Sequence, residues 1–363
     1  MILFNDLKLQ YIQIREEIDF AMQKVLSAGR YILGEELDAF EKEFAEYIGA
    51  DYCVGVASGT DAITLLLMAL NIGENDEVIT TNMTAFPTIV GIIRSGATPV
   101  LVDICTDDGL IDCGRIEERI TERTRAIMPV HLYGQTCNMD RITALADKHG
   151  LKVIEDSAQA VGSSYRGRKA GSLGFCSAFS FYPTKNLGAF GDGGAITSGD
   201  EEVYNKLLLL RNYGKTDMYH HKTEGINSRL DELQAAILRV KLKYIDRWNK
   251  KRKEIALFYQ ENLLSVDCLK QNSYGESNYH LFVVKCDEHR DELMSHLKIN
   301  GIESLIHYPV PINKQKAFPV KREEELEASN KFADSVLSLP IHQYLQSKEL
   351  NQIVEVINDF KRK

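Results

Sequence analysis

Two hydrophobic periods alternate along the first half of the chain. Apolar residues three or four apart predict amphipathic helices over 4–26 and 35–48. Short apolar runs that fit buried strands follow at 52–57, 77–81, 98–102, 124–130 and 151–156. Segments that can hold helices separate these runs, at 62–70, 88–94, 113–120 and 138–149. Strands that alternate with helices predict an α/β fold with a mostly parallel central sheet and right-handed crossovers.

The pattern changes in the second half of the chain. Helical spacing covers 201–211 and then a long run over 230–258, which we expect to link two domains. Beyond residue 263 the expected strands and helices are shorter, at 280–285, 289–300, 302–306, 323–335 and 347–361. We therefore predict N-terminal helices and a large domain over 1–245, and a smaller α+β domain over 246–363.

A single lysine lies between a predicted strand and a glycine-rich loop. Apolar residues alternate over 175–181, and Pro183 ends this strand because proline has no N–H for a ladder. Lys185 follows, and then the glycines at 188, 191, 193 and 194. A lysine among apolar residues loses its proton more easily, and a neutral amine can attack an aldehyde. Taken alone, such a lysine is far more often a surface residue in a hairpin turn, and only the rest of the chain reverses this interpretation.

Composition narrows the class of protein. The 363 residues carry a formal charge of −9, which does not favour nucleic-acid binding. No apolar run approaches the roughly 20 residues of a membrane span, and the N-terminus does not resemble a signal peptide. The 7 cysteines are scattered and never form a C-x-x-C pair. They predict a reduced, cytoplasmic protein with no metal site.

Two further features follow predicted strands. Ser58-Gly59-Thr60-Asp61 opens a helix, where free N–H groups can hold a phosphate, and Asp156 ends another strand. Ligands of parallel sheets lie beyond the carboxyl ends of the strands, so these residues and Lys185 can face one cleft. Pyridoxal phosphate (PLP) accounts for all of them. It needs a lysine for its aldehyde, a carboxylate for its pyridine nitrogen and donors for its phosphate.

With these motifs in view, the chain resembles the DegT/StrS family of nucleotide-sugar aminotransferases, PLP enzymes with the aspartate-aminotransferase fold. The resemblance covers nearly the whole chain in order. It is carried by residues 27–34, 55–62, 130–134, 155–160, 180–186, 191–195, 225–236 and 307–311.

The resemblance implies a role for each matching residue. Lys185 forms the Schiff base and later moves a proton between the substrate α-carbon and C4′ of the cofactor. Asp156 pairs with the pyridinium nitrogen, and Gln159 hydrogen-bonds the ring hydroxyl. His131 is interpreted as structural.

The resemblance also implies the phosphate contacts. Gly59 and Thr60 bind the phosphate through their N–H groups, with the Asp61 N–H as a possible addition, and Ser180 contributes its hydroxyl. Asn227 reaches the phosphate in the neighbouring subunit. The active unit is therefore expected to be a homodimer with shared sites.

The stacking and substrate contacts follow the family pattern less closely. Many members place an aromatic residue on the cofactor ring where the gapless match puts Ala85. Either Phe86, one residue later, takes over the stacking and is the predicted contact, or a small residue packs there and the ring face is covered differently. The predicted substrate contacts are Tyr308, Arg229, Tyr213 and Asn186.

The predicted activity is transfer of an amino group from an amino acid, L-glutamate by preference, to a keto group at C3 or C4 of a nucleotide-linked deoxysugar. The alternative is a non-catalytic sensor or regulator with the PLP fold, although a scaffold would need none of Lys185, Asp156 and Gln159. A dinucleotide-dependent oxidoreductase is a weaker alternative, because residues 55–60 do not supply G-x-G-x-x-G. The sequence leaves the sugar, the nucleotide and the stereochemistry open.

Overall fold

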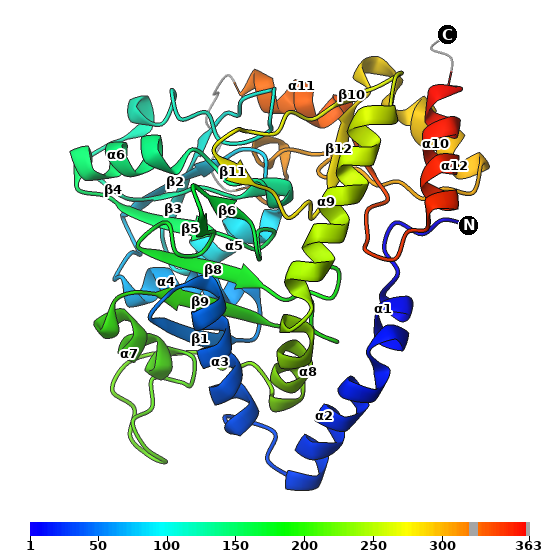
Figure 1. Ribbon diagram of the computed structural model, residues 1–363. Coiled ribbons are helices and arrows are strands. Elements are labelled where there is room, and N and C mark those ends of the chain that lie inside the picture. The colour runs from blue at the N-terminus through cyan, green and yellow to red at the C-terminus, as the bar shows by residue number, and fades with distance from the viewer. Residues whose placement is uncertain (319–325, 361–363) are drawn as a thin grey trace.

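The protein is built around a seven-stranded sheet in the order β1-β9-β8-β5-β4-β2-β3 (Figure 1). The structure, a computed structural model, describes residues 1–318 and 326–360. The strands are β1 (Tyr52–Val56), β2 (Glu77–Thr81), β3 (Thr98–Val102), β4 (Thr124–Met128), β5 (Lys152–Asp156), β8 (Cys176–Ser180) and β9 (Gly194–Ser198). Neighbours from β8 to β3 run parallel, and β9 is antiparallel to both β8 and β1.

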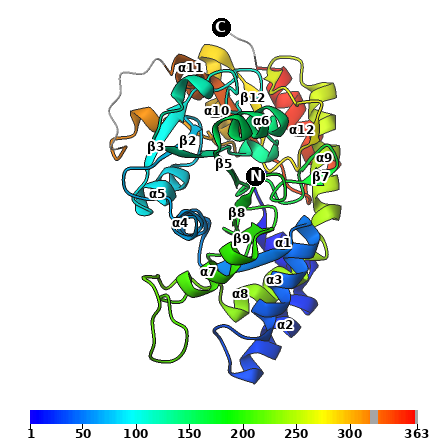
Figure 2. The same cartoon turned by 90° about the vertical axis from the view of Figure 1, so that its left-hand side faces the viewer.

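Helices cover both faces of this sheet (Figure 2). One face carries α4 (Gly59–Ala69), α5 (Phe86–Arg94) and α7 (Glu201–Leu210), and the other α3 (Glu35–Ile48), α6 (Met139–His149) and α8 (Glu232–Leu242). Side chains of β8 alternate between the two: Ala178 packs on the α4 side, and Phe179 meets Phe44 of α3 with ring centroids 5.0 Å apart. Burial on both faces explains the continuous apolar runs and confirms the α/β fold.

A smaller antiparallel sheet, β10-β12-β13, forms a second centre of packing. It comprises β10 (Asp267–Cys268), β12 (Phe282–Lys285) and β13 (Val336–Leu339), packed with α9 (Ile245–Asn262), α10 (Arg290–Ile299) and α12 (Ser347–Asn358). Helix α9 joins both cores, since Trp248 packs with the α3 and α8 side chains and Tyr259 packs in the C-terminal cluster. The domain boundary after residue 245 stays a prediction.

The remaining helices, strands and turns complete the fold. They are α1 (Leu7–Gln13), α2 (Arg15–Ala28), α11 (Glu327–Ser335), the strands β6 (Ser164–Tyr165), β7 (Arg168–Lys169) and β11 (Gly275–Glu276), and the 3-10 turns Glu117–Arg119, Leu132–Gly134, Asp287–His289 and Ile312–Lys314. Within the described ranges, no helix is both long and apolar enough to cross a bilayer.

Several predicted elements differ from the structure. The helix expected over 4–26 is interrupted at Ile14, whose backbone φ is −125°. The run over 230–258 is interrupted between α8 and α9, where the Tyr244 N–H bonds only three residues back, to Lys241 O. The helix expected over 113–120 is a single 3-10 turn. Residues 302–306 make isolated bridges to Ile2 and Ser338 instead of a strand. Residues 323–325 and 361, expected in helices, lie outside the described residues.

Candidate active site

A cavity of about 390 Å³ lies beyond the ends of β5 and β8. Six of the predicted site residues line it: Gly59, Thr60, Asp156, Gln159, Ser180 and Lys185. They come from α4, from the segments that follow β5 and β8, and from the last residue of each of those strands. The sheet thus brings together residues that lie up to 126 positions apart in the sequence.

Lys185 sits on a tight turn after β8. Its N–H donates to Tyr182 O at 2.8 Å, and the Ala189 N–H donates back to Phe181 O at 2.8 Å. Gly188 closes this turn, since a Cβ there would lie 2.3 Å from Pro183 O. Burial lowers the pKa of the Lys185 amine to about 8, although nearby Asp156 acts in the opposite direction. A substantial fraction of the amine is therefore neutral near pH 8.

Asp156 presents a buried carboxylate to the cavity. Its Oδ2 accepts from the Thr88 hydroxyl at 2.8 Å and its Oδ1 from the Ala158 N–H at 3.1 Å. Burial raises the pKa of this carboxyl above its ordinary value of 3.8, while Thr88 and Lys185 pull it down. A cation that entered the cavity would stabilise the charged form.

The first turn of α4 offers free donors to the same cavity. Ser58 caps the helix by accepting the Asp61 N–H at 3.1 Å, so the predicted contribution of Asp61 is taken up by the cap. The N–H groups of Gly59 and Thr60 have no acceptor among the described residues. Gly59 is needed because a Cβ there would lie 2.7 Å from Ser180 Cβ. This close approach builds an anion site from a helix N-terminus and a serine hydroxyl.

Gln159 joins the cavity to the C-terminal part of the chain. Its Oε1 accepts the Tyr133 N–H at 2.6 Å, and its Nε2 donates to Tyr308 Oη at 2.9 Å. One N–H of the Gln159 amide is left for a ligand. Tyr308 is half-buried and borders the cavity through this bond.

Two of the predicted residues lie next to residues that line the cavity but do not line it themselves. Phe86 packs with Leu101 and Ile312 beneath α5, whereas Ala85 and Pro87 line the cavity. Successive residues at the start of a helix point in different directions, so Ala85, the position of the gapless match, lines the cavity while Phe86 does not. Asn186 is buried and bonds to Asn249 and to Asn278 O, so the structure does not support it as a substrate contact.

Three predicted residues lie on a projecting arm, residues 212–227 together with Arg229 at its base (Figure 1). Bridges between Asn212 and Asn227 and between Lys215 and His221 pair its two sides. Asn227 is exposed, as is Tyr213, and Arg229 donates to Asn212 Oδ1 at 3.1 Å. None of the three lines the cavity of this chain.

The base of the arm is fixed beside the α4 turn. The Ser228 hydroxyl donates to Asp61 Oδ2 at 2.8 Å and accepts the Ala57 N–H at 3.1 Å. Because these bonds are made next to Gly59, the arm starts at the anion site and points away from it.

Sequence reasoning missed several residues that line the cavity, among them Thr88, Tyr182 and Asp192. Thr88 lies one turn beyond Thr84, and their hydroxyls are 2.9 Å apart. The threonine pair in Thr84-x-x-x-Thr88 was the available signal, because i and i+4 residues share one side of a helical turn.

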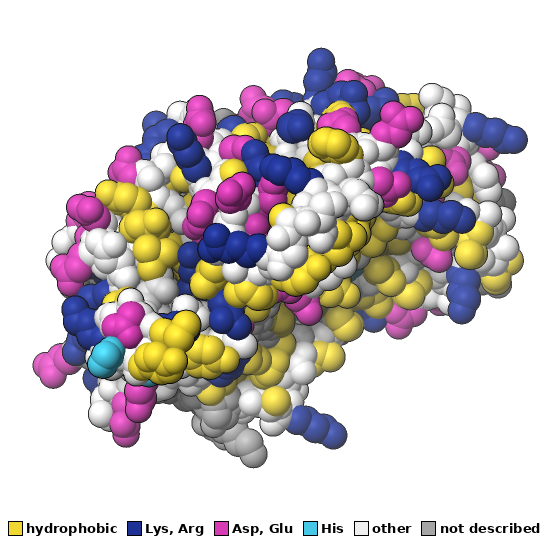
Figure 3. All heavy atoms as spheres, turned by 90° about the horizontal axis from the view of Figure 1, so that it is seen from below, with side chains coloured by type: hydrophobic (Ala, Val, Ile, Leu, Met, Phe, Trp, Pro, Cys, Tyr) yellow, Lys and Arg dark blue, Asp and Glu magenta, His cyan; other side chains and the backbone are white. Residues whose placement is uncertain are grey.

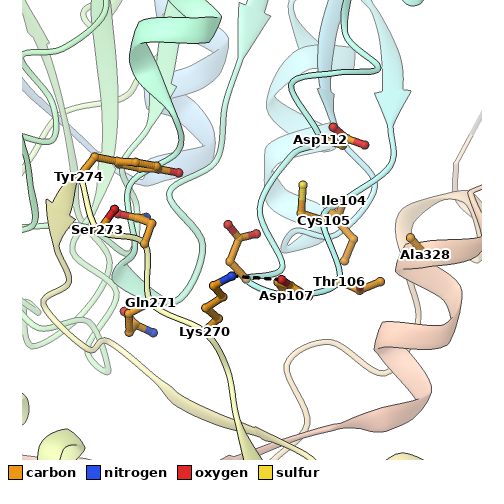
Figure 4. Close-up of a pocket in the computed structure, with 12 residues that line it drawn as sticks. Ile104, Cys105, Thr106, Asp107, Asp112, Lys270, Gln271, Ser273, Tyr274 and Ala328 are labelled. Atoms are coloured by element: carbon orange, nitrogen blue, oxygen red, sulfur yellow. Dashed lines mark hydrogen bonds and ion pairs between the residues drawn. The ribbon is translucent and has the colours of Figure 1, made fainter.

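A larger cavity of about 670 Å³ lies between residues of 104–112 and 270–274 (Figure 4). An ion pair crosses it from Lys270 Nζ to Asp107 Oδ2, at 3.4 Å. It holds none of the predicted site residues. No group of three or more histidine, cysteine or acidic side chains in the described ranges could hold a metal ion.

The donor set of the smaller cavity fits PLP. An amine with a lowered pKa suits the aldehyde, a buried carboxylate that faces the cavity suits a protonated ring nitrogen, and free N–H groups with a serine hydroxyl suit the phosphate. The Cβ that Gly59 lacks would fill the space where the helix and β8 approach each other.

Comparison with known proteins agrees with this assignment. The chain is 45% identical over 362 residues to the dTDP-3-amino-3,4,6-trideoxy-alpha-D-glucose transaminase of Streptomyces venezuelae, covering 98% of this chain and 95% of that protein. It is 47% identical over 362 residues to the dTDP-3-amino-3,6-dideoxy-alpha-D-galactopyranose transaminase of Aneurinibacillus thermoaerophilus, covering 99% of each.

A solved structure shows the same fold. The crystal structure of S. venezuelae DesV in complex with a ketimine intermediate matches with a TM-score of 0.96 and 45% identity, covering 99% of this chain and 98% of that one. The profile of the DegT/DnrJ/EryC1/StrS aminotransferase family matches residues 12–358. The chain therefore belongs to this family of PLP-dependent aminotransferases.

Proposed function

We propose that this aminotransferase moves an amino group from L-glutamate to a keto group at C3 of a nucleotide-linked deoxysugar. The observation that carries the proposal is the convergence of the Lys185 amine, the Asp156 carboxylate and the free N–H groups of α4 in one cavity. Two similar relatives are named as transaminases of 3-amino sugars, and this supports C3 over C4.

Each side chain has a distinct task in this chemistry. PLP, when bound, supplies an aldehyde that takes up the amino group and a ring that withdraws electrons from the reacting carbon. Lys185 holds the cofactor and then, as a free amine, moves the proton at the reacting carbon. Asp156 stabilises positive charge on the ring nitrogen, and Gly59, Thr60 and Ser180 bind the phosphate.

The substrate groups enter from the side of Tyr308. This phenol already contacts Gln159, which orients it toward the cavity. We assign Tyr308 to the sugar and leave Tyr213 and Arg229 as candidate contacts for the nucleotide, provided that the arm reaches a second subunit.

We further propose a homodimer with shared sites, working in the cytoplasm, as the reduced cysteines suggest. Asn227 lies on the exposed arm and faces no group of its own cavity. Large apolar side chains are exposed on the arm and on α2, at 81% for Tyr219, 71% for Met218 and 75% for Phe20. Figure 3 shows hydrophobic patches on the underside, where both segments lie in Figure 1. Exposed apolar patches of this kind mark protein interfaces.

The first test is the visible absorbance spectrum of the purified protein with PLP, before and after L-glutamate is added. The spectrum should show lysine-bound cofactor and then change to that of the aminated cofactor. A dTDP-linked 3-keto-deoxysugar should restore the first spectrum, and its 4-keto isomer should not. A colourless protein would support a non-catalytic scaffold instead.

Lys185→Ala supplies the matching control. It should abolish the lysine-bound spectrum and lower turnover by at least about 10²–10⁴-fold, the range for loss of a positioned proton-transfer group. Full turnover by this variant would contradict the proposal.

A further inference from the structure

Three buried asparagines from distant parts of the chain meet beside the Lys185 turn. Asn186 follows the lysine directly, Asn249 lies on α9, and Asn278 lies in the segment that precedes β12. Their exposed fractions are 5%, 9% and 1%. Buried amides are retained where their hydrogen bonds are satisfied, and each of these three side chains makes hydrogen bonds to the chain around it. We call these residues the asparagine triad.

Asn186 is held on three sides. Its Nδ2 donates to Asn249 Oδ1 at 2.8 Å and to Asn278 O at 3.0 Å. Because a backbone carbonyl can only accept, this fixes the orientation of the amide, and Oδ1 must face His280 Nδ1, 3.1 Å away. Burial keeps the pKa of His280 well below its ordinary value, so the ring is neutral and donates its proton from Nδ1.

The other two members extend these contacts to the Gln159 segment. Asn278 Nδ2 donates to Gln159 O and to Val161 O, each at 3.0 Å, and Asn249 Nδ2 donates to Val161 O at 3.0 Å. Asn278 is closely enclosed as well, since a Cβ on Gly134 would lie 1.8 Å from its Oδ1. The turn that carries Lys185 and the loop that carries Gln159 are therefore bonded to the same two residues, to the side chain of Asn249 and to the backbone and side chain of Asn278.

We propose that the asparagine triad is a positioning network, which holds Lys185 at a fixed place relative to Gln159 and ties both to α9. None of the three side chains lines the cavity, so they act through the residues next to them. The network rests on the proposed function, because it assigns Lys185 the central chemical role. It also explains why an asparagine follows that lysine directly.

The surroundings of Lys185 predict the direction in which the pKa of its amine changes when a triad residue is replaced. If the turn is released, water reaches the amine, and the main cause of its lowered pKa is weakened. The titratable groups that surround the lysine or share its cavity are Asp156, Asp192, Tyr182, His280 and His307. Alanine in place of an asparagine adds no charge to this set.

The experiment measures Lys185 in the cofactor-free protein. A short pulse of acetic anhydride at a series of pH values, followed by mass spectrometry, gives the midpoint of its reactivity. The wild-type midpoint should lie at about 8. In Asn186→Ala it should rise by about one unit or more, toward the ordinary range of lysine. Asn249→Ala removes only one of the two acceptors of Asn186 and should give a smaller rise.

Asn138→Ala is the matched control. Asn138 caps α6 by accepting the Arg141 N–H at 3.2 Å and makes no contact with the Lys185 turn. Its loss should lower the melting temperature and leave the Lys185 midpoint unchanged. In protein loaded with PLP, the triad variants should lower kcat and leave the KM for the sugar nearly unchanged.

An unchanged Lys185 midpoint in a folded Asn186→Ala variant would overturn the proposal and reduce the triad to a packing feature. If Asn186→Ala does not fold, the Lys185 midpoint is measured in Asn249→Ala, and an unchanged midpoint there would overturn the proposal in the same way. The labelling uses no cofactor. If the wild-type protein failed to bind PLP, the proposed function would be rejected. The labelling experiment would still show whether the triad positions Lys185.

Discussion

Two neighbouring acids at the end of β5 have different tasks because side chains alternate along a strand. Glu155 accepts the N–H groups of Gly171, Leu173 and Gly174, each at 2.8 Å, and pairs with His131 Nε2 at 2.9 Å. His131 Nδ1 accepts the Cys137 N–H, so its proton lies on Nε2, in a structural bond. These bonds fix the register of β5 and thereby direct Asp156 to the cavity.

Replacing Asp156 by asparagine removes the negative charge of the side chain and keeps its size and shape. The amide can keep the contacts with Thr88 and Ala158, but it cannot stabilise a protonated ring nitrogen. We expect kcat to fall by about 10²-fold or more, as for other losses of a preorganised electrostatic group. Steady-state kinetics with saturating PLP would measure this, and a kcat within about twofold of wild type would contradict the assigned role.

The same substitution has a predicted pH signature in the cofactor-free protein. Because the pKa of Asp156 is raised by folding, the folded state binds more protons than the unfolded state above pH 3.8. The free energy of unfolding therefore falls as the pH rises through the folded-state pKa. Asp156→Asn should melt at a higher temperature than wild type at pH 7, and the difference should shrink toward pH 4. A lower melting temperature at pH 7 would be the contrary result.

The sequence predicts well which residues meet at one cavity where each of them follows a strand. Gly59, Asp156, Ser180 and Lys185 lie at strand ends or helix starts, and parallel topology alone brings such positions together. The sequence predicts the cavity lining poorly where a shift of one position along the chain turns a side chain toward or away from the cavity. Phe86 and Asn186 each neighbour a residue that lines the cavity, yet turn away from it. No local pattern records the partners that hold them there.

At the scale of the element, the start of α4 depends on a close approach to the sheet. Gly59 lies against Ser180, and a Cβ on Gly194 of β9 would lie 2.4 Å from the Ser58 carbonyl carbon. Glycine at these two positions lets the first turn of the helix reach the strand ends, so that its N–H groups point into the cavity.

Gly59→Ala should therefore push α4 away from β8. We expect a loss of about 1–3 kcal/mol in the free energy of unfolding from overpacking. The affinity for PLP should fall by about tenfold or more, which corresponds to roughly 1.4 kcal/mol. Denaturant unfolding and PLP titration measure the two effects.

Gly199→Ala is the comparison for this prediction. A Cβ at Gly199 would meet only the end of the Asp51 side chain, at 3.3 Å, which can move. This variant should bind PLP like the wild type. Equal PLP affinity in the two variants would show that the close approach at Gly59 does not shape the anion site.

Some helix interruptions and short strands cannot be predicted from the hydrophobic pattern of the sequence. The interruptions at Ile14 and between α8 and α9 contain no glycine or proline, so the helical pattern continues through them in the sequence. The two-residue strands β6, β7, β10 and β11 are too short to show alternation. They exist because distant segments pair, as Gly275 does with Tyr165. Tertiary contacts override local propensity at these places.

At the scale of the molecule, the long α9 joins the packing around the large sheet to that around the small one, and the arm projects from beside the start of α4. The arm begins at bonds made beside Gly59, and near its tip the side chains of Met218 and Tyr219 are 71% and 81% exposed. A second copy related by twofold symmetry would receive the arm and return its own.

Mixed dimers test this arrangement. In a dimer of one Lys185→Ala chain and one Asn227→Ala chain, shared sites would give one doubly damaged site and one intact site. Such a dimer, purified through two different tags, should have about half of the wild-type activity, as twofold symmetry requires. Each homodimer of a single variant should be far less active. A mixed dimer no more active than the mean of the two homodimers would contradict the shared site.

The arm also bears on how a defective copy of the gene would behave in a cell. In the proposed shared-site dimer, a subunit that lacks only Lys185 would still lend an intact arm, so its partner would keep working. A subunit that lacks both Lys185 and Asn227 would lose its own site and would also deprive its partner of the arm. Expressed beside the native chain, the doubly altered subunit would be dominant, whereas the singly altered one would be tolerated.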